Sequence, residues 1–137
     1  MSGLYIDSTP SEVSQAKGLH LLTFNTPNGQ KVQILLHELA LLYDIKWTTS
    51  VIKLFEGTQK QDWFLRLNPN GKIPTLVDNT NTSPLPVMET TAIMLYLAET
   101  YDTNHVLSFS DPVERAQMLQ WLFFWHGSGQ PLSLIHI

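Results

Sequence analysis

Residues 19–24 (LHLLTF) form a short apolar run that ends in the turn-prone segment Asn25-Thr26-Pro27-Asn28-Gly29. An apolar run of this length with a turn signal behind it is typical of a buried strand. Thr26 suits a helix N-cap, and Pro27 suits the first helical position, where the missing N–H has no intrahelical partner to lose. We therefore predict a buried strand that leads directly into a helix.

The segment after Pro27 has the apolar periodicity of a helix that packs on a sheet. Its apolar residues stand at i, i+3, i+4, i+7 and i+10, and they are Val32, Leu35, Leu36, Leu39 and Leu42. Residues 45–54 (IKWTTSVIKL) are rich in β-branched and aromatic side chains, which favours a second strand. A strand, a helix and a strand in this order predict a parallel βαβ unit.

The next part of the chain predicts a short helix, a hairpin and a closing helix. Residues 61–67 indicate a brief helix that ends before Asn68-Pro69-Asn70-Gly71. Residues 73–77 and 85–88 flank a polar turn and are expected to pair as an antiparallel hairpin, and residues 90–101 have helical spacing. The predicted fold class is α/β, a βαβαββα domain with a mixed four-stranded sheet.

A second, helical region is expected after this domain. Asp111 and Pro112 suit the N-cap and first position of another helix. Residues 121–125 (WLFFW) are apolar on every side, which in a helix indicates burial on more than one face. We expect this helix to be the first of an otherwise missing all-α domain.

From these elements we predict that the chain has four parts. Residues 1–18 are expected to be a flexible leader, residues 19–102 the α/β domain, residues 103–110 a linker and residues 111–137 the truncated start of the helical domain. The final residues 132–137 (LSLIHI) depart from the helical pattern. They resemble translated sequencing adaptor, and a natural but atypical terminus is the alternative.

Composition excludes several classes of function. The chain has no cysteine, so it can supply no disulfide, thiolate metal site or cysteine nucleophile. Twelve acidic and eight basic side chains give a formal charge of -4, which disfavours nucleic acid as a partner.

Membrane and metal partners are not expected either. No segment approaches the roughly 20 apolar residues of a membrane span, and residues 1–18 resemble neither a secretory nor a transit signal. The histidines lack metal-ligand spacing, and phosphate-binding loops are absent. We expect a soluble, cytoplasmic protein without a metal or nucleotide cofactor.

Two motifs at a matching distance carry a family resemblance. Asn68-Pro69-Asn70-Gly71-Lys72-Ile73-Pro74 precedes the third predicted strand, and Val87-Met88-Glu89-Thr90-Thr91-Ala92-Ile93 opens the last helix. With the order βαβαββα, they resemble the thioredoxin-like domain of glutathione transferases. Residues 26–31 (TPNGQK) further resemble the bacterial nu-class enzymes and the fungal transferases related to the yeast nitrogen-regulatory prion protein. The resemblance covers about residues 19–130.

The resemblance implies a binding site for glutathione as co-substrate. It makes the peptide bond between Ile73 and Pro74 cis and pairs the Ile73 backbone with the cysteinyl part of the ligand. It assigns the γ-glutamyl end to Glu89 and Thr90, since a helix N-terminus suits a carboxylate and an acid suits an ammonium group. The alternatives are a trans proline at the start of an edge strand and an ordinary capped helix.

The resemblance assigns less specific roles to two further side chains. Lys72 and Gln59 match positions that reach the glycyl carboxylate or neighbouring polar atoms of glutathione. Solvated surface side chains are the alternative reading of both residues.

The thiol of glutathione would be activated at the start of the first long helix. The thiolate is the reactive form, and helix N–H groups with a side-chain donor lower a thiol pKa. The resemblance assigns the sulfur contacts to Thr26 and Asn28 as the catalytic residues. The alternative is a purely structural turn, with Thr26 capping the helix and Asn28 solvated.

Two classes of function remain open from the sequence. The first is an enzyme, a glutathione transferase or glutathione-dependent disulfide reductase acting on an unknown electrophile or disulfide. The second is a non-catalytic regulatory or scaffolding module with the same fold. The resemblance also implies a homodimer.

Overall fold

The computed structural model describes residues 3–131 as two compact units, Met1–Met94 and Leu95–Ile137. The boundary falls inside a helix, whereas the sequence analysis placed a linker at residues 103–110. The predicted domain boundaries therefore stay predictions. The expectation for residues 132–137 lies outside the described residues.

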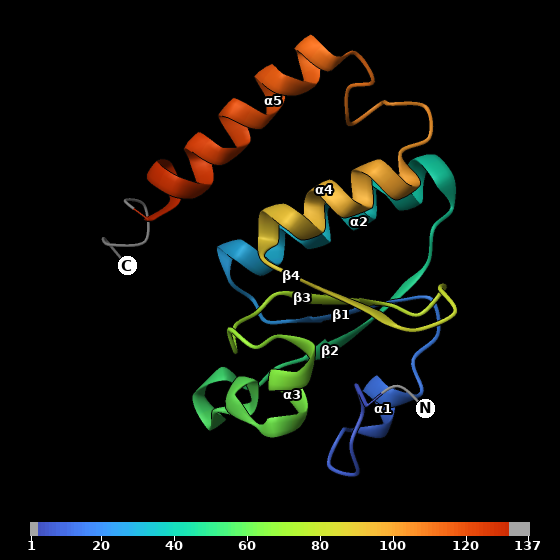
Figure 1. Cartoon of the computed structure of the whole chain (residues 1–137), viewed down its shortest axis with the longest axis vertical. Coiled ribbons are helices and arrows are strands. Elements are labelled where there is room, and N and C mark those ends of the chain that lie inside the picture. Colours follow the sequence, from blue (N-terminus) through green and yellow to red (C-terminus); the bar gives the residue numbers. More distant parts are fainter. Residues whose placement is uncertain (1–2, 132–137) are drawn as a thin grey trace. The chain divides into compact units, whose positions relative to one another are not determined.

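The first unit contains a mixed four-stranded sheet, as predicted (Figure 1). Its strands are β1 (Leu19–Thr23), β2 (Trp47–Val51), β3 (Thr75–Asp78) and β4 (Leu85–Met88). The strand order is β2-β1-β3-β4, with β1 parallel to β2 and antiparallel to β3, and with β3 antiparallel to β4. Both the parallel βαβ unit and the antiparallel hairpin are confirmed.

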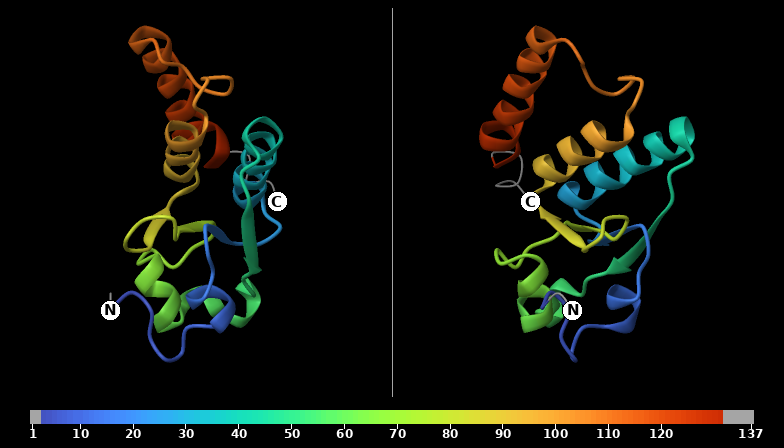
Figure 2. Two further views of the ribbon diagram at one scale, coloured as in Figure 1. Left: turned by 90° about the vertical axis from the view of Figure 1, so that its right-hand side faces the viewer. Right: turned by 45° about the vertical axis from the view of Figure 1, so that its right-hand side comes forward.

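Helices lie on both faces of this sheet. Helix α2 (Pro27–Tyr43) and the first turn of α4 (Thr90–Tyr101) lie on one face, and α1 (Ser11–Ser14) and α3 (Asp62–Leu67) lie on the other (Figures 1 and 2). Two short 3₁₀ turns, η1 (Leu54–Glu56) and η2 (Thr58–Lys60), connect β2 to α3. This arrangement agrees with the predicted thioredoxin-like fold.

The face of α2 that packs on the sheet follows the predicted periodicity for most of its length. Val32, Leu36 and Leu39 are fully buried, but Leu42 is 44% exposed. The helix of 17 residues is about 25 Å long, whereas the neighbouring five-residue strand spans about 17 Å. The last turn of α2 therefore extends past the strand, which explains the exposure of Leu42.

The opposite face of the sheet holds a core to which the N-terminal segment contributes. Val13 is buried there with Leu22 and Val77, and Leu4, Tyr5 and Ile6 pack against the same cluster. This differs from the flexible leader expected over residues 1–18. The segment has only isolated apolar residues and a four-residue helix, so it lacks the periodicity from which burial can be predicted.

The second unit contains an ordered loop and a helix. After α4, the buried carboxylate of Asp102 accepts hydrogen bonds from Val106 N at 2.9 Å, Leu107 N at 2.8 Å and Ser108 Oγ at 2.7 Å. Helix α5 (Pro112–Phe124) begins at the predicted N-cap Asp111, and a π-helical turn, η3 (Trp125–Gly129), follows it. The large apolar side chains at the end of α5 are exposed, and they are Trp121, Phe123, Phe124 and Trp125. Among residues 3–131, no helix combines the length and the apolar character that crossing a membrane requires.

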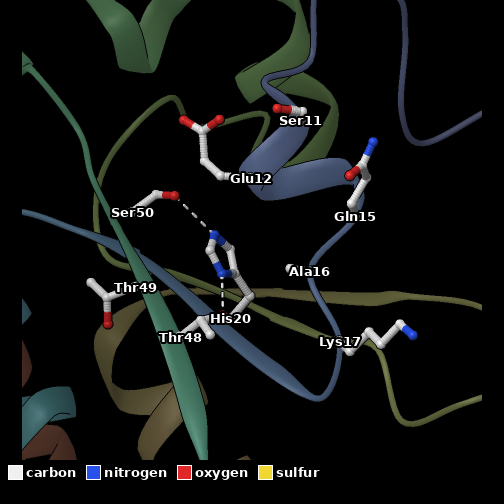
Figure 3. A pocket seen from close by; sticks show the side chains of 9 residues that line it. All are labelled: Ser11, Glu12, Gln15, Ala16, Lys17, His20, Thr48, Thr49 and Ser50. Atoms are coloured by element: carbon white, nitrogen blue, oxygen red, sulfur yellow. Dashed lines mark hydrogen bonds between the residues drawn. The ribbon is translucent and has the colours of Figure 1, made fainter.

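His20 is a buried polar residue on the α1 side of the sheet (Figure 3). Its Nδ1 lies 2.7 Å from Thr48 Oγ1 and its Nε2 lies 3.1 Å from Ser50 Oγ, so both ring nitrogens are hydrogen bonded to β2. Burial lowers the pKa of His20 below its ordinary value of 6.5, and the nearby carboxylate of Glu12 offsets part of this shift. The neutral ring is therefore the form that the folded chain favours.

His20 should make the stability of the chain depend on pH. Because its pKa is lower in the folded chain, the unfolded chain takes up the proton first as the pH falls. The contribution of the neutral ring is thus present above the unfolded pKa of about 6.5 and is lost as the pH falls towards the folded pKa. Chemical unfolding between about pH 5 and pH 8 should show this loss in the wild type and a smaller one in His20→Gln. The exposed His37→Gln is the control, and equal pH dependence in all three chains would contradict the assignment.

Candidate functional site

The register of the sheet brings the predicted site residues to one edge. Leu22 near the end of β1 pairs with Thr75 at the start of β3, and Thr75 also pairs with Met88 at the end of β4. The segments that carry Thr26, Ile73 and Glu89 come directly after β1, before β3 and after β4, respectively. Backbone pairing alone therefore places these three segments side by side.

The start of α2 has the capped geometry that the sequence predicted. The side chain of Thr26 accepts a hydrogen bond from Gly29 N at 3.2 Å, and Pro27 occupies the first turn. The Thr26 hydroxyl keeps its own hydrogen as a donor, and the half-buried Asn28 follows in the same turn. This end of the helix therefore combines a hydroxyl donor with the positive end of the helix dipole.

Gly29 allows α2 to begin close to the end of β1. A Cβ atom at this position would come closer to Thr23 Oγ1 and to the backbone oxygen of Phe24 than real Cβ atoms do. The absence of a side chain is thus a steric requirement for the position of the helix N-terminus beside the sheet edge.

The loop before β3 is held by the side chain of Asn68, which is 1% exposed. Its Nδ2 donates to Lys72 O at 2.8 Å and to Thr75 Oγ1 at 2.9 Å, and its Oδ1 accepts from Asn70 N at 2.9 Å. The bond between Ile73 and Pro74 is cis, as the resemblance implied. Asn68 thereby fixes the backbone on both sides of this loop and places Ile73 next to the strand.

Glu89 and Thr90 lie where β4 passes into α4. Glu89 has a φ of 71°, and its carbonyl accepts a hydrogen bond from Ile93 N at 2.9 Å. Its exposed carboxylate accepts a hydrogen bond from Asn70 Nδ2 at 2.9 Å, and Thr90 is only 4% exposed. The loop before β3 and the start of α4 are therefore connected directly.

Lys72 and Gln59 lie at this edge in different ways. The side chain of Lys72 is exposed, while its backbone oxygen is bound by Asn68. Gln59 Nε2 donates to Leu54 O at 3.3 Å, and its Oε1 is buried without a partner. The backbone of Gln59 lies against Gly71, where a Cβ would be 2.9 Å from Gln59 O. The structure thus brings Gln59 to the loop, with its side-chain nitrogen turned towards its own segment.

Sequence reasoning missed Asn68 and Asn70 as parts of this site. The segment Asn68-Pro69-Asn70-Gly71 was used only as a helix stop and as part of a family motif. The repeated asparagines were the available signal, because asparagine side chains commonly bond to backbone groups in turns.

A cleft of about 460 Å³ lies elsewhere in the first unit, beside His20 (Figure 3). It is bordered by α1 and by Thr48, Thr49 and Ser50 of β2, and none of the predicted site residues lines it. We do not assign the function to this cleft, because both His20 nitrogens are already bonded to hydroxyl groups. Within residues 3–131, no group of three or more histidine, cysteine, aspartate or glutamate side chains is arranged to hold a metal ion.

Comparisons with known proteins support the family that the motifs predicted. A sequence model described as "Glutathione S-transferase, N-terminal domain" matches residues 26–100, more than half of the chain. The disulfide-bond oxidoreductase YghU of Escherichia coli is 38% identical over 112 residues, which are 80% of this chain and 38% of that protein.

Two solved structures extend the comparison to the fold. A glutathione transferase homologue from Lodderomyces elongisporus, solved with two GSH molecules per subunit, is 35% identical with a TM-score of 0.78, covering 85% of this chain and 54% of that one. The nitrogen regulation fragment of the yeast prion protein Ure2p is 29% identical with a TM-score of 0.73, covering 88% of this chain and 51% of that one. The chain spans less than half the length of the curated relatives it matches.

Gly29→Ala should test the steric requirement at the start of α2. The added methyl group would press on the Phe24 carbonyl and force the helix away from the strand. Overpacking of this kind costs roughly 1–3 kcal/mol, measured as the free energy of unfolding in denaturant. Gly127→Ala is the control, since a Cβ there meets nothing within 4 Å. Equal stability of Gly29→Ala and wild type would show that the close approach does not constrain the helix.

Proposed function

This chain belongs to the glutathione S-transferase family, and from that membership we propose that it binds glutathione at the edge of the sheet where Thr26, Ile73 and Glu89 meet. In the complete protein, the bound thiol is activated for conjugation to an electrophile or for reduction of a disulfide. The observation that carries this proposal is the register of β1, β3 and β4, which brings the three predicted segments together.

The proposed site recognises the two ends and the middle of the tripeptide by different means. The γ-glutamyl carboxylate binds at the N-terminus of α4 and the Thr90 hydroxyl, and the ammonium group binds Glu89. The cysteinyl backbone pairs with Ile73, whose cis bond to Pro74 turns the backbone there. The exposed Lys72 side chain provides a cation for the glycyl carboxylate, and Gln59 reaches the same end after rotation of its amide.

Thiol activation is assigned to the start of α2. A glutathione thiol with a reference pKa near roughly 8.5 is mostly protonated at neutral pH. The Thr26 hydroxyl, the Asn28 amide and the N-terminal N–H groups of α2 stabilise the thiolate more than the thiol. Lowering the pKa by about two units requires roughly 2.7 kcal/mol of this differential stabilisation, which two or three such donors can supply.

The second candidate function is a regulatory or scaffolding module that binds glutathione without turnover. The observation that favours it is the similarity to the nitrogen regulation fragment of a yeast prion protein, at 29% identity. For either function, we propose a homodimer in the cytoplasm, on the basis of the family. The second substrate of the enzyme is an electrophile or a disulfide.

Glutathione binding can be measured directly by isothermal titration calorimetry. The double variant Glu89→Ala/Thr90→Ala should weaken binding by at least about tenfold, because it removes the partners of both charged groups at the γ-glutamyl end. Glu114→Ala is the control, since Glu114 is an exposed acid in the first turn of α5, whereas Glu89 is an exposed acid immediately before α4. Wild type that is folded and does not bind glutathione at millimolar concentration would overturn the proposed site.

The role of Asn28 can be separated from binding. The thiolate absorbance of bound glutathione, followed against pH, should give a thiol pKa below that of free glutathione. In Asn28→Ala we expect this pKa to rise by about one unit, which corresponds to roughly 1.4 kcal/mol, with only a small change in affinity. An unchanged thiol pKa in Asn28→Ala would remove Asn28 from the catalytic residues.

A further inference from the structure

Glu89 is held in an unusual position for an acidic residue. The backbone of Glu89 has a φ of 71°, which is in the left-handed region. Residues other than glycine, asparagine and aspartate seldom adopt this conformation. The backbone at Glu89 is fixed by its place between β4 and α4, but its exposed side chain has rotatable bonds of its own. A carboxylate that is to meet a ligand at one point needs a second contact to hold it there.

Asn70 provides that contact. Its Nδ2 donates to Glu89 Oε1 at 2.9 Å across 19 positions of sequence. Asn70 is itself anchored, because its N–H donates to Asn68 Oδ1 at 2.9 Å and its carbonyl oxygen accepts from Lys60 Nζ at 3.3 Å. Because both the N–H group and the carbonyl oxygen of Asn70 are hydrogen bonded, its backbone is held in place, and its side chain can in turn hold the carboxylate that it binds.

We propose that Asn70 is a positioning residue that aims the carboxylate of Glu89 at the ammonium group of a γ-glutamyl ligand. This inference rests on the proposed function and adds to it the residue on which selectivity for the free ammonium group depends. Asn70 acts through Glu89 and does not itself contact the ligand.

The chemistry of the amide suits this role. A neutral N–H donor orients a carboxylate without cancelling its charge, whereas a lysine or arginine would compete with the ammonium group of the ligand. In the part of the chain that the structure describes, no basic side chain forms an ion pair with Glu89. Lys60, which belongs to the same hydrogen-bond network, is bound to the carbonyl oxygen of Asn70. No cation within the described residues therefore competes with the ligand for the Glu89 carboxylate, and its second oxygen is available to the ligand.

A comparison of two ligands tests the inference. The first is glutathione, and the second is glutaryl-cysteinyl-glycine, which has the same carboxylates and thiol but lacks the ammonium group. Asn70→Ala should weaken glutathione binding by about fivefold, as expected for the loss of one hydrogen bond to a charged group, and should change binding of the second ligand by less than about twofold. Asn81→Ala, in the exposed turn between β3 and β4, is the control that should change neither.

A pH profile separates positioning from a general loosening of the loop. Asn70→Asp replaces the donor with a carboxyl group that can still donate when protonated and that repels Glu89 when ionised. Because the neighbouring carboxylate of Glu89 raises the pKa of the introduced aspartate above its reference of about 3.9, the ratio of its glutathione dissociation constant to that of wild type should rise as the pH is raised from about 4.5 to about 7. Asn70→Ala should show a constant ratio over the same range, and thermal unfolding checks that both variants are folded.

The outcomes are distinct. Equal weakening of both ligands by Asn70→Ala, or a flat ratio for Asn70→Asp, overturns the positioning role while the proposed function stands. Wild type that does not bind glutathione overturns the proposed function and this inference together. Loss confined to glutathione, with the expected pH profile, supports Asn70 as the positioning residue.

Discussion

Thr75 pairs with Leu22 on one side and with Met88 on the other, and its hydroxyl accepts a hydrogen bond from Asn68 at 2.9 Å. The first two contacts fix how the ends of β1 and β4 lie relative to the start of β3, and the third ties the loop before β3 to the sheet. A shift of one residue in this register would turn every side chain of the moved strand to the opposite face. The buried residues on both faces of β3 make such a shift costly, so the position of the site edge is set by the core of the sheet.

Two helix N-termini also lie at the site edge. Helix α2 begins directly after β1 and α4 begins directly after β4, and both strands end at this edge. Each N-terminus carries a partial positive charge and N–H groups without intrahelical partners. The formal charge of the chain is -4, but charges in solvent are screened beyond about 8 Å at physiological salt. In the proposed site, the attraction of an anionic tripeptide therefore depends on these local donors, and Glu89 is proposed as the counter-charge for its ammonium group.

The sequence was sufficient for the parts of this arrangement that have a local cause. The buried strand, the cap at Thr26 and the hairpin each follow from residues that are neighbours in the chain. Contacts between distant residues did not follow in the same way. The bond between Asn70 and Glu89 depends on a pairing of strands that brings the two together, and the packing of Val13 depends on a surface that the sheet creates. The motifs at residues 68–74 and 87–93 indicated a site, but only the structure shows that the side chain of Asn70 connects them.

Binding and activation of glutathione make separate demands on this edge. The contacts proposed for Ile73, Glu89 and Thr90 involve groups of the ligand that do not change when the thiol ionises, so these contacts would bind both forms of glutathione equally. Such uniform binding lowers the ligand concentration that is needed but does not favour the thiolate. Only donors that face the sulfur favour the thiolate, and this is the role proposed for Thr26 and Asn28. On the proposed assignment, loss of the donors at the start of α2 would leave the γ-glutamyl half of the site able to bind glutathione and would remove the activation of its thiol.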